Sequence, residues 1–123
     1  MKSLSDEQIV KNLGKLYNIV LSLRKDDDYE INQEQMDKLC ALYRFFLDSA
    51  DKLDGKAELC KLVPKEEHGG VTATFLVFDV YGDNVKKFAE VISHCSAIGI
   101  DSLADGQICI GCTIPNVFVK KSN

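Results

Sequence analysis

Cys109 and Cys112 form a CxxC pair, the spacing in this sequence that could best serve chemistry. Such a pair can act as a redox dithiol or supply half of a zinc site. A redox pair usually opens a helix, whereas this one lies within an expected strand. Side chains three residues apart on a regular strand point to opposite faces, so the two sulfur atoms should diverge. We therefore interpret Cys112 as a core residue on the face of Ile110 and Ile114.

A zinc or thiol protein that uses Cys109 and Cys112 remains an alternative, with Cys95 or Cys60 as a helper. Five cysteines are an odd number for a disulfide scaffold. The start of the sequence also lacks the apolar core of a secretory signal. Both features predict reduced thiols and a cytoplasmic protein.

A second group of candidate residues lies where an expected strand turns into a helix. Its members are Asp79, Tyr81, Gly82, Asp83, Lys86 and Lys87. Helix N-termini after strands can bind anions, because their backbone amides point outward. These residues define a candidate site for a small anion. The simpler interpretation, which we favour, is that Asp79 faces water and Asp83 caps the helix.

The order of strand, glycine turn, helix and strand from Phe75 to Ile114 resembles the first half of an ACT-type ligand-sensing domain. The resemblance implies a small-molecule sensor. The second βαβ half of such a domain is absent, and helical segments precede the motif instead.

The sequence offers no pattern typical of an enzyme. His68 falls in a polar linker and His94 on the solvent side of a helix, and neither has a histidine four residues away. No Gly-rich phosphate loop, nucleophile elbow or paired-acid spacing occurs. We therefore expect no catalytic residues, no enzymatic activity and no bound cofactor.

The first 64 residues predict a helical hairpin. Ser5 can cap a helix whose apolar stripe ends near Arg24, and Asn32 can cap a second helix that ends at Gly55. Two helices joined by a short polar loop most simply pack antiparallel.

Lys56 to Leu62 is expected to form a short third helical piece, because Leu59 and Leu62 are three residues apart. Pro64 would close this piece. Residues 65–70 are polar and end in two glycines, so they are expected to link the helical part to the rest of the domain.

Residues 71–119 predict a β-α-β-β unit, with a short tail at 120–123. Its expected elements are a strand at 71–81, a helix between Gly82 and Gly99, and strands at 100–104 and 107–114. The predicted fold is α+β in a single domain, 1–123. An N-terminal helical hairpin packs with the β-α-β-β unit around a small, mainly antiparallel three-stranded sheet.

The strand at 71–81 is apolar on both faces. Alternation places Phe75 on one face and Leu76, Phe78 and Val80 on the other. One helix cannot cover both faces, so the hairpin or a partner chain must cover the second. We expect the hairpin to be the main cover, with a homodimer adding strands or helices.

Composition excludes several classes of function. Apolar residues make up 46% and charged residues 28%, which is typical of a soluble globular protein. The net charge is −4 and the basic residues are dispersed, which argues against direct nucleic-acid binding. An acidic surface that mimics nucleic acid is a minor alternative. No stretch approaches the roughly 20 apolar residues of a membrane span.

The sequence favours a small cytoplasmic protein–protein interaction module, bound to itself or to a protein partner. Tyrosine is enriched at interfaces, so Tyr17, Tyr43 and Tyr81 are the expected contact residues, together with an exposed sheet edge. Small-anion sensing at 81–87 and a zinc or thiol function are the alternatives.

Overall fold

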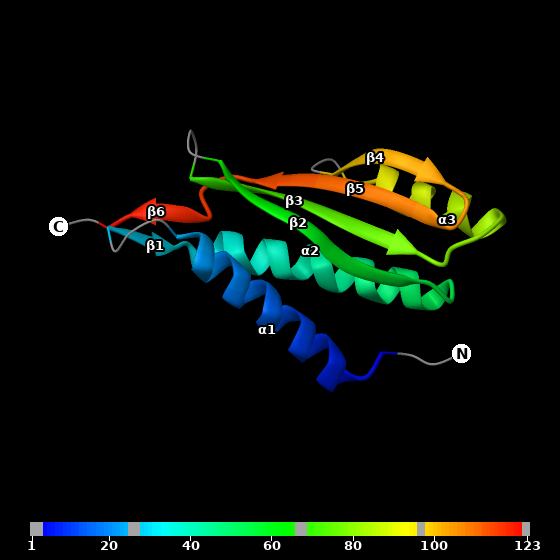
Figure 1. The fold of residues 1–123 in the computed structure, drawn as a ribbon, viewed down its shortest axis with the longest axis horizontal. Coiled ribbons are helices and arrows are strands. Elements are labelled where there is room, and N and C mark those ends of the chain that lie inside the picture. The colour runs from blue at the N-terminus through cyan, green and yellow to red at the C-terminus, as the bar shows by residue number, and fades with distance from the viewer. Residues whose placement is uncertain (1–3, 25–27, 66–68, 96–97, 122–123) are drawn as a thin grey trace.

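The chain has an α+β fold, with three helices and two antiparallel sheets in the residues that the structure describes (Figure 1). The structure is a computed structural model and describes residues 4–24, 28–65, 69–95 and 98–121. Its elements are α1 (Asp6–Leu23), β1 (Tyr29–Ile31), α2 (Gln33–Lys52), β2 (Lys56–Lys65), β3 (Gly70–Phe78), α3 (Asp83–Ser93), β4 (Ile98–Ala104), β5 (Gln107–Ile114) and β6 (Phe118–Lys120).

Both N-terminal helices form where the sequence predicts them. The Ser5 hydroxyl accepts a hydrogen bond from the Gln8 amide at 3.2 Å, and the Gln8 side chain accepts one from the Ser5 amide at 3.1 Å. This capping box satisfies amides that have no partner inside α1. Asn32 holds the N-cap position of α2 without a side-chain hydrogen bond. α1 packs on α2 and on the edge strand β2.

The main sheet has four strands in the order β2-β3-β5-β4, and all neighbours are antiparallel. The predicted third helical piece is wrong, because this segment belongs to β2. A bulge between Leu59 and Lys61 explains the error. Its extra residue places Leu59 and Leu62 on one face of the strand, and that spacing of three resembles a helix. Pro64 lies within β2, on an edge strand where proline is tolerated.

Three other boundaries differ from the prediction. Lys65 pairs with Gly70, so the two ends of the expected linker belong to β2 and β3, while its residues 66–68 lie outside the described residues. α3 ends at Ser93 rather than Gly99, and the Ser93 hydroxyl donates to a backbone carbonyl three residues earlier at 2.7 Å, which competes with the helical pattern. Lys120 closes β6 instead of starting a tail.

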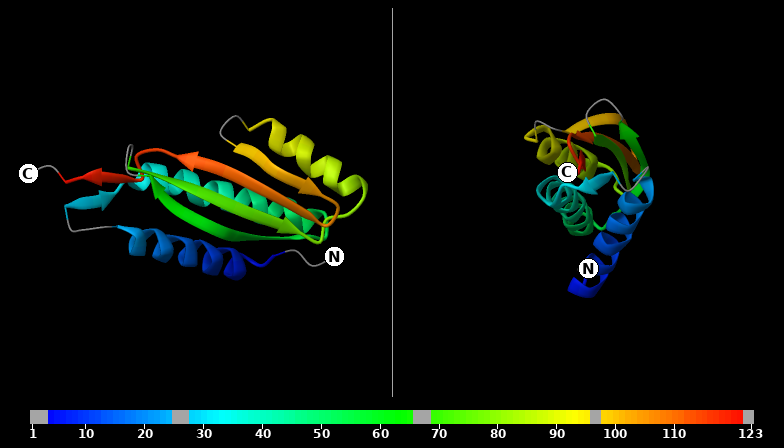
Figure 2. Two further views of the ribbon diagram at one scale, coloured as in Figure 1. Left: turned by 45° about the horizontal axis from the view of Figure 1, so that its top comes forward. Right: turned by 90° about the vertical axis from the view of Figure 1, so that its left-hand side faces the viewer.

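α2 and α3 lie on the same face of the main sheet (Figure 2). The Phe75 ring of β3 lies 5.3 Å from the Tyr43 ring and 4.9 Å from the Phe46 ring of α2, measured between centroids. Ile110 of β5 stands opposite Phe75 and is fully buried. The buried side chains of α3 join the same cluster, so one continuous core fills this side of the sheet.

The second face of the sheet has no helical cover within the described residues, so the predicted position of the hairpin is wrong. Asp79 explains part of the error, because its φ of 63° ends β3 at Phe78. Val80 then turns into the core and is fully buried. The second face keeps Leu76 and Phe78 as its half-buried apolar residues on β3.

A two-stranded sheet joins the α1–α2 connection to the end of the described chain. β1 pairs antiparallel with β6, with Tyr29 opposite Lys120. The Asn32 amide donates to the Val117 carbonyl at 2.8 Å. Val117 is fully buried, so the chain packs on the core just before β6.

Candidate functional site

The turn between β3 and α3 brings together the predicted anion-site residues. Asp79, Tyr81, Gly82, Asp83, Lys86 and Lys87 are all exposed. The Gly82 amide donates a 2.7 Å hydrogen bond to Oδ1 of Asp105, in the turn between β4 and β5. A carboxylate of the chain itself therefore occupies the position at which this helix end would hold an anion.

Two further amides of this turn also have hydrogen-bond partners within the chain. The Asn84 and Val85 amides donate to the carbonyls of Tyr81 and Gly82, each at 3.2 Å. Asp83 adds a negative charge to the first turn of α3. A small anion would have to displace the Asp105 carboxylate to reach the Gly82 amide.

Cys109 and Cys112 lie on opposite faces of the sheet. Cys109 stands opposite Leu76 on the uncovered face, whereas Cys112 stands opposite Ala73 on the helix-covered face. Burial raises the pKa of the Cys112 thiol to about 11. The two sulfur atoms could not ligate one metal ion without a change in the strand.

The remaining candidate metal ligands are dispersed over the fold. Cys60 is exposed on β2, Cys95 is half-buried after α3, and His94 is exposed. His68 lies outside the described residues. Among the residues that are described, no group of three or more His, Cys, Asp or Glu side chains could hold a metal ion.

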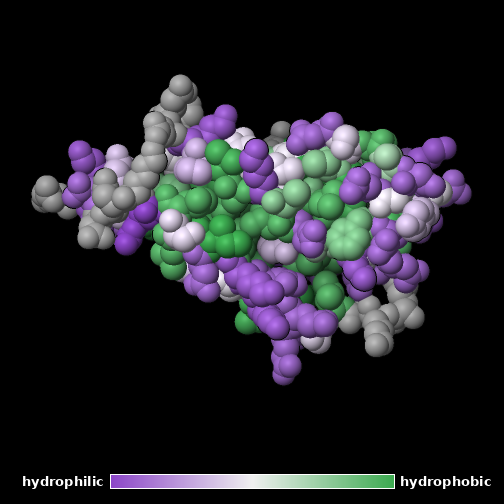
Figure 3. Space-filling model, viewed as in Figure 1, coloured by the Kyte–Doolittle hydropathy of each residue, from purple (hydrophilic) through white to green (hydrophobic). Residues whose placement is uncertain are grey.

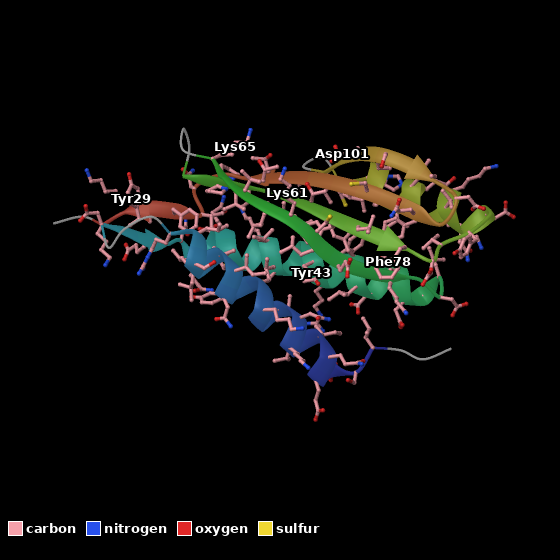
Figure 4. The ribbon with its side chains drawn as sticks, viewed as in Figure 1. Tyr29, Tyr43, Lys61, Lys65, Phe78 and Asp101 are labelled. Carbon is pink, nitrogen blue, oxygen red and sulfur yellow. The ribbon has the colours of Figure 1, made fainter. Side chains whose placement is uncertain are left out.

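The three tyrosines of the predicted interface lie in different environments. Tyr43 lies on α2 (Figure 4) and is buried against Phe75, so it is not available to a partner. Tyr17 is half-buried against the core. Tyr81 is 59% exposed and is the member of this set that a second protein could contact.

The uncovered face of the sheet mixes apolar and polar side chains (Figure 3). Leu76 and Phe78 are half-buried on β3, and Val63 of β2 is 39% exposed. The Thr72 and Thr113 hydroxyl oxygens lie 3.2 Å apart across β3 and β5. Threonines between the apolar residues allow this face to be hydrated, as one face of an antiparallel sheet often is.

Charged residues flank this face on both outer strands. Lys61 and Lys65 of β2 and Asp101 of β4 are all exposed (Figure 4). A Cβ atom at Gly111 would come within 2.7 Å of Oδ2 of Asp101, so this carboxylate lies over β5. Asp101 and Gly111 line a shallow hollow together with Thr74.

The β2 edge of the sheet carries several forms of protection. α1 packs against this strand. Lys61, Lys65 and Pro64 lie on it, and the bulge between Leu59 and Lys61 interrupts its ladder. Lysine, proline, bulges and helical cover all hinder the addition of another strand.

The opposite edge, formed by β4 and called here the β4 edge, is more apolar. Ile100 is 37% exposed and Leu103 is 51% exposed, although their partners on β5, Ile110 and Ile108, are fully buried. Ile100 and Leu103 therefore lie on the helix-covered face of the sheet, at the margin where that cover ends. Val91 of α3 is also exposed.

The sequence points to β4 as a strand but not to the exposure of its side chains. A bulge between Ile100 and Ser102 places Ile100 and Leu103 on one face at a spacing of three. The sequence shows that these residues are apolar, but its periodicity does not show where the helices stop covering the sheet, and so it does not predict that they are exposed.

A groove of about 560 Å³ lies between α1, α2 and β2. Tyr43 and Leu47 contribute buried side chains to it, and Asp51, Asp54 and Glu58 contribute carboxylates. In the described residues no buried side-chain polar atom lacks a hydrogen-bond partner. The Asp51 carboxylate already accepts a 3.3 Å hydrogen bond from the amide of Leu4, which also lines the groove.

No model of a protein family matches this sequence, and no curated protein or solved structure matches it significantly. None of the described helices is long and apolar enough to cross a membrane. Function must be inferred from the surfaces of the chain itself.

Proposed function

We propose that this protein is a small cytoplasmic interaction module that associates with itself and has no catalytic activity of its own. The observation that carries the proposal is the one-sided packing of the sheet. α2 and α3 cover the same face and α1 packs on β2, which leaves the β4 edge in contact with solvent. An apolar, uncovered edge strand is a surface to which another chain can add.

The scatter of reactive side chains supports the proposed lack of catalysis. Cys109 and Cys112 face opposite sides of the sheet, and Gly82 at the start of α3 is already bonded to Asp105. Nucleophilic catalysis needs a nucleophile within hydrogen-bonding reach of a base. The unpaired state of all five cysteines supports the proposed reducing compartment.

Sedimentation velocity of the reduced protein over a wide concentration range tests the proposal. The expected result is a shift from monomer to dimer as the concentration rises, with no change on addition of a chelator. A single monomeric species at every concentration would contradict self-association. Native mass spectrometry of the same sample checks for a bound metal or metabolite, which would contradict a plain interaction module.

A further inference from the structure

We infer that the chain self-associates through the β4 edge, where β4 of one copy pairs antiparallel with β4 of a second copy. The two four-stranded sheets then form one continuous sheet. This inference rests on the proposed function and names both the surface and its occupant, a second copy of this chain.

The difference between the two sheet edges selects β4. The β2 edge is covered by α1 and carries Lys61, Lys65 and Pro64. β4 contains neither lysine nor proline, and among the described residues no strand pairs with its outer side (Figure 1). Both edge strands contain a bulge, and β4 has one charged residue, Asp101. A second strand meets less interference at β4, because this edge lacks the lysines, the proline and the helical cover of β2.

The single charge of β4 is directed away from the edge. Asp101 is its only ionisable residue, and its carboxylate lies over Gly111 of β5 on the open face. Strand addition in the plane of the sheet would leave this face, and therefore this carboxylate, in water. Pairing thus does not bury a charge.

Ile100 and Leu103 supply the apolar contact that backbone pairing alone lacks. Both lie on the helix-covered side of β4 and are 37% and 51% exposed. In an antiparallel pair around a two-fold axis, each strand presents the same apolar side chains to its copy, so the surface is complementary to itself. The exposed Val91 of α3 lies on the helix that packs against β4.

The same arrangement limits the assembly to two copies. After β4 has paired, the outer strands of the joined sheet are the two β2 strands. Their lysines, proline and bulges, together with α1, hinder further addition. A dimer is expected rather than an open filament.

Lysine substitutions at matched exposed positions test the inference. Leu103→Lys and Ile100→Lys each place a charge at the β4 edge. Val63→Lys is the control, because Val63 is 39% exposed on the open face, close to the 37% of Ile100. The expected result is a dimer dissociation constant at least tenfold higher for both β4 variants, with an unchanged value for Val63→Lys. Circular dichroism verifies that each variant is folded.

Amide hydrogen exchange gives a second measurement that does not depend on a substitution at the edge. Amides of Ile98–Ala104 should exchange more slowly in the concentrated wild-type dimer than in the dilute monomer, while those of β2 should not change.

The outcomes separate the inference from the proposed function. If the wild-type protein dimerises and both β4 variants dimerise equally well, the dimer interface is not the β4 edge, although self-association stands. The same conclusion follows if only Val63→Lys weakens the dimer. A wild-type chain that stays monomeric would overturn both.

Discussion

The carboxylate of Asp101 lies over Gly111, where a Cβ atom would come within 2.7 Å of its Oδ2 atom. The lack of a side chain at Gly111 on β5 therefore makes room for the charge of β4. Asp101 is the residue left unpaired by the bulge between Ile100 and Ser102, so a backbone irregularity and a glycine together direct the only charge of β4 over the open face of the sheet.

Gly111→Ala should move the Asp101 carboxylate off β5. Asp101 is exposed and flexible, so the free energy of unfolding should change by less than about 1 kcal/mol. The displaced charge should weaken the dimer, because like charges then approach across the two-fold axis. Sedimentation measures the dissociation constant, and urea denaturation measures the stability.

The double variant Gly111→Ala with Asp101→Asn should dimerise like the wild type, because the displaced side chain then carries no charge. If Gly111→Ala alone does not weaken the dimer, this role of Gly111 is contradicted.

Gly55→Ala should destabilise the fold strongly. The added Cβ atom would meet Val80 Cγ2 at 2.5 Å and the Phe78 carbonyl oxygen at 2.9 Å, and backbone cannot give way as a side-chain tip can. Overpacking of this kind costs about 1–3 kcal/mol in the free energy of unfolding.

Gly14→Ala on α1 is the matched control for Gly55→Ala. No atom lies within 4 Å of a Cβ atom at this exposed position. Alanine should therefore stabilise the protein by about 0.5–1 kcal/mol, because glycine is a poor helix former. Urea denaturation measures the free energy of unfolding of both variants. An equal change in the two would contradict the close packing around Gly55.

The free energy of unfolding should fall at alkaline pH because of the buried thiol of Cys112. Burial raises the pKa of its thiol from 9.0 to about 11, so the folded state retains this proton after the unfolded chain has lost it. The resulting stabilisation is fully present below pH 9 and is lost as pH rises toward 11. Between about pH 8 and about pH 10, Cys112→Ala should lose less stability than the wild type. Parallel pH profiles would argue that this thiol is not buried.

Asp105→Ala should loosen the start of α3. It removes the carboxylate that accepts the 2.7 Å hydrogen bond from the Gly82 amide, at an expected cost of about 0.5–1.5 kcal/mol. Asp105→Asn keeps an acceptor oxygen and should cost less. Thermal unfolding with added sulfate tests the anion alternative in the same samples: stabilisation of Asp105→Ala but not of the wild type would show that the freed amide can bind an anion.

Sequence periodicity predicts the elements whose burial pattern is regular. α1, α2, β3 and β5 each have apolar residues at the spacing of their own geometry, and so each was identifiable. β2 was not, because its inward residues are Ala57, Leu59 and Leu62, at spacings of two and then three. A bulge changes strand periodicity into a pattern that also fits a helix.

The opposite orientation of Cys109 and Cys112 also followed from periodicity, because β5 has no bulge between them. The β4 edge could not be found in this way. Its exposure depends on the extent of the cover given by α3 and on the side of the sheet that α2 takes. Both are set by packing between segments far apart in the chain, which local patterns do not record.

The β1–β6 pair has a consequence for the order in which the chain can fold. The Lys121 amide donates to the Asp28 carbonyl at 2.7 Å, and the Phe118 amide donates to the Gly69 carbonyl at 2.8 Å. These bonds join early and late parts of the chain, and contacts of such long sequence separation are slow to form. A nascent chain must therefore wait for β6 to leave the ribosome before β1 finds its partner, and until then the place of Val117 in the core stays unfilled.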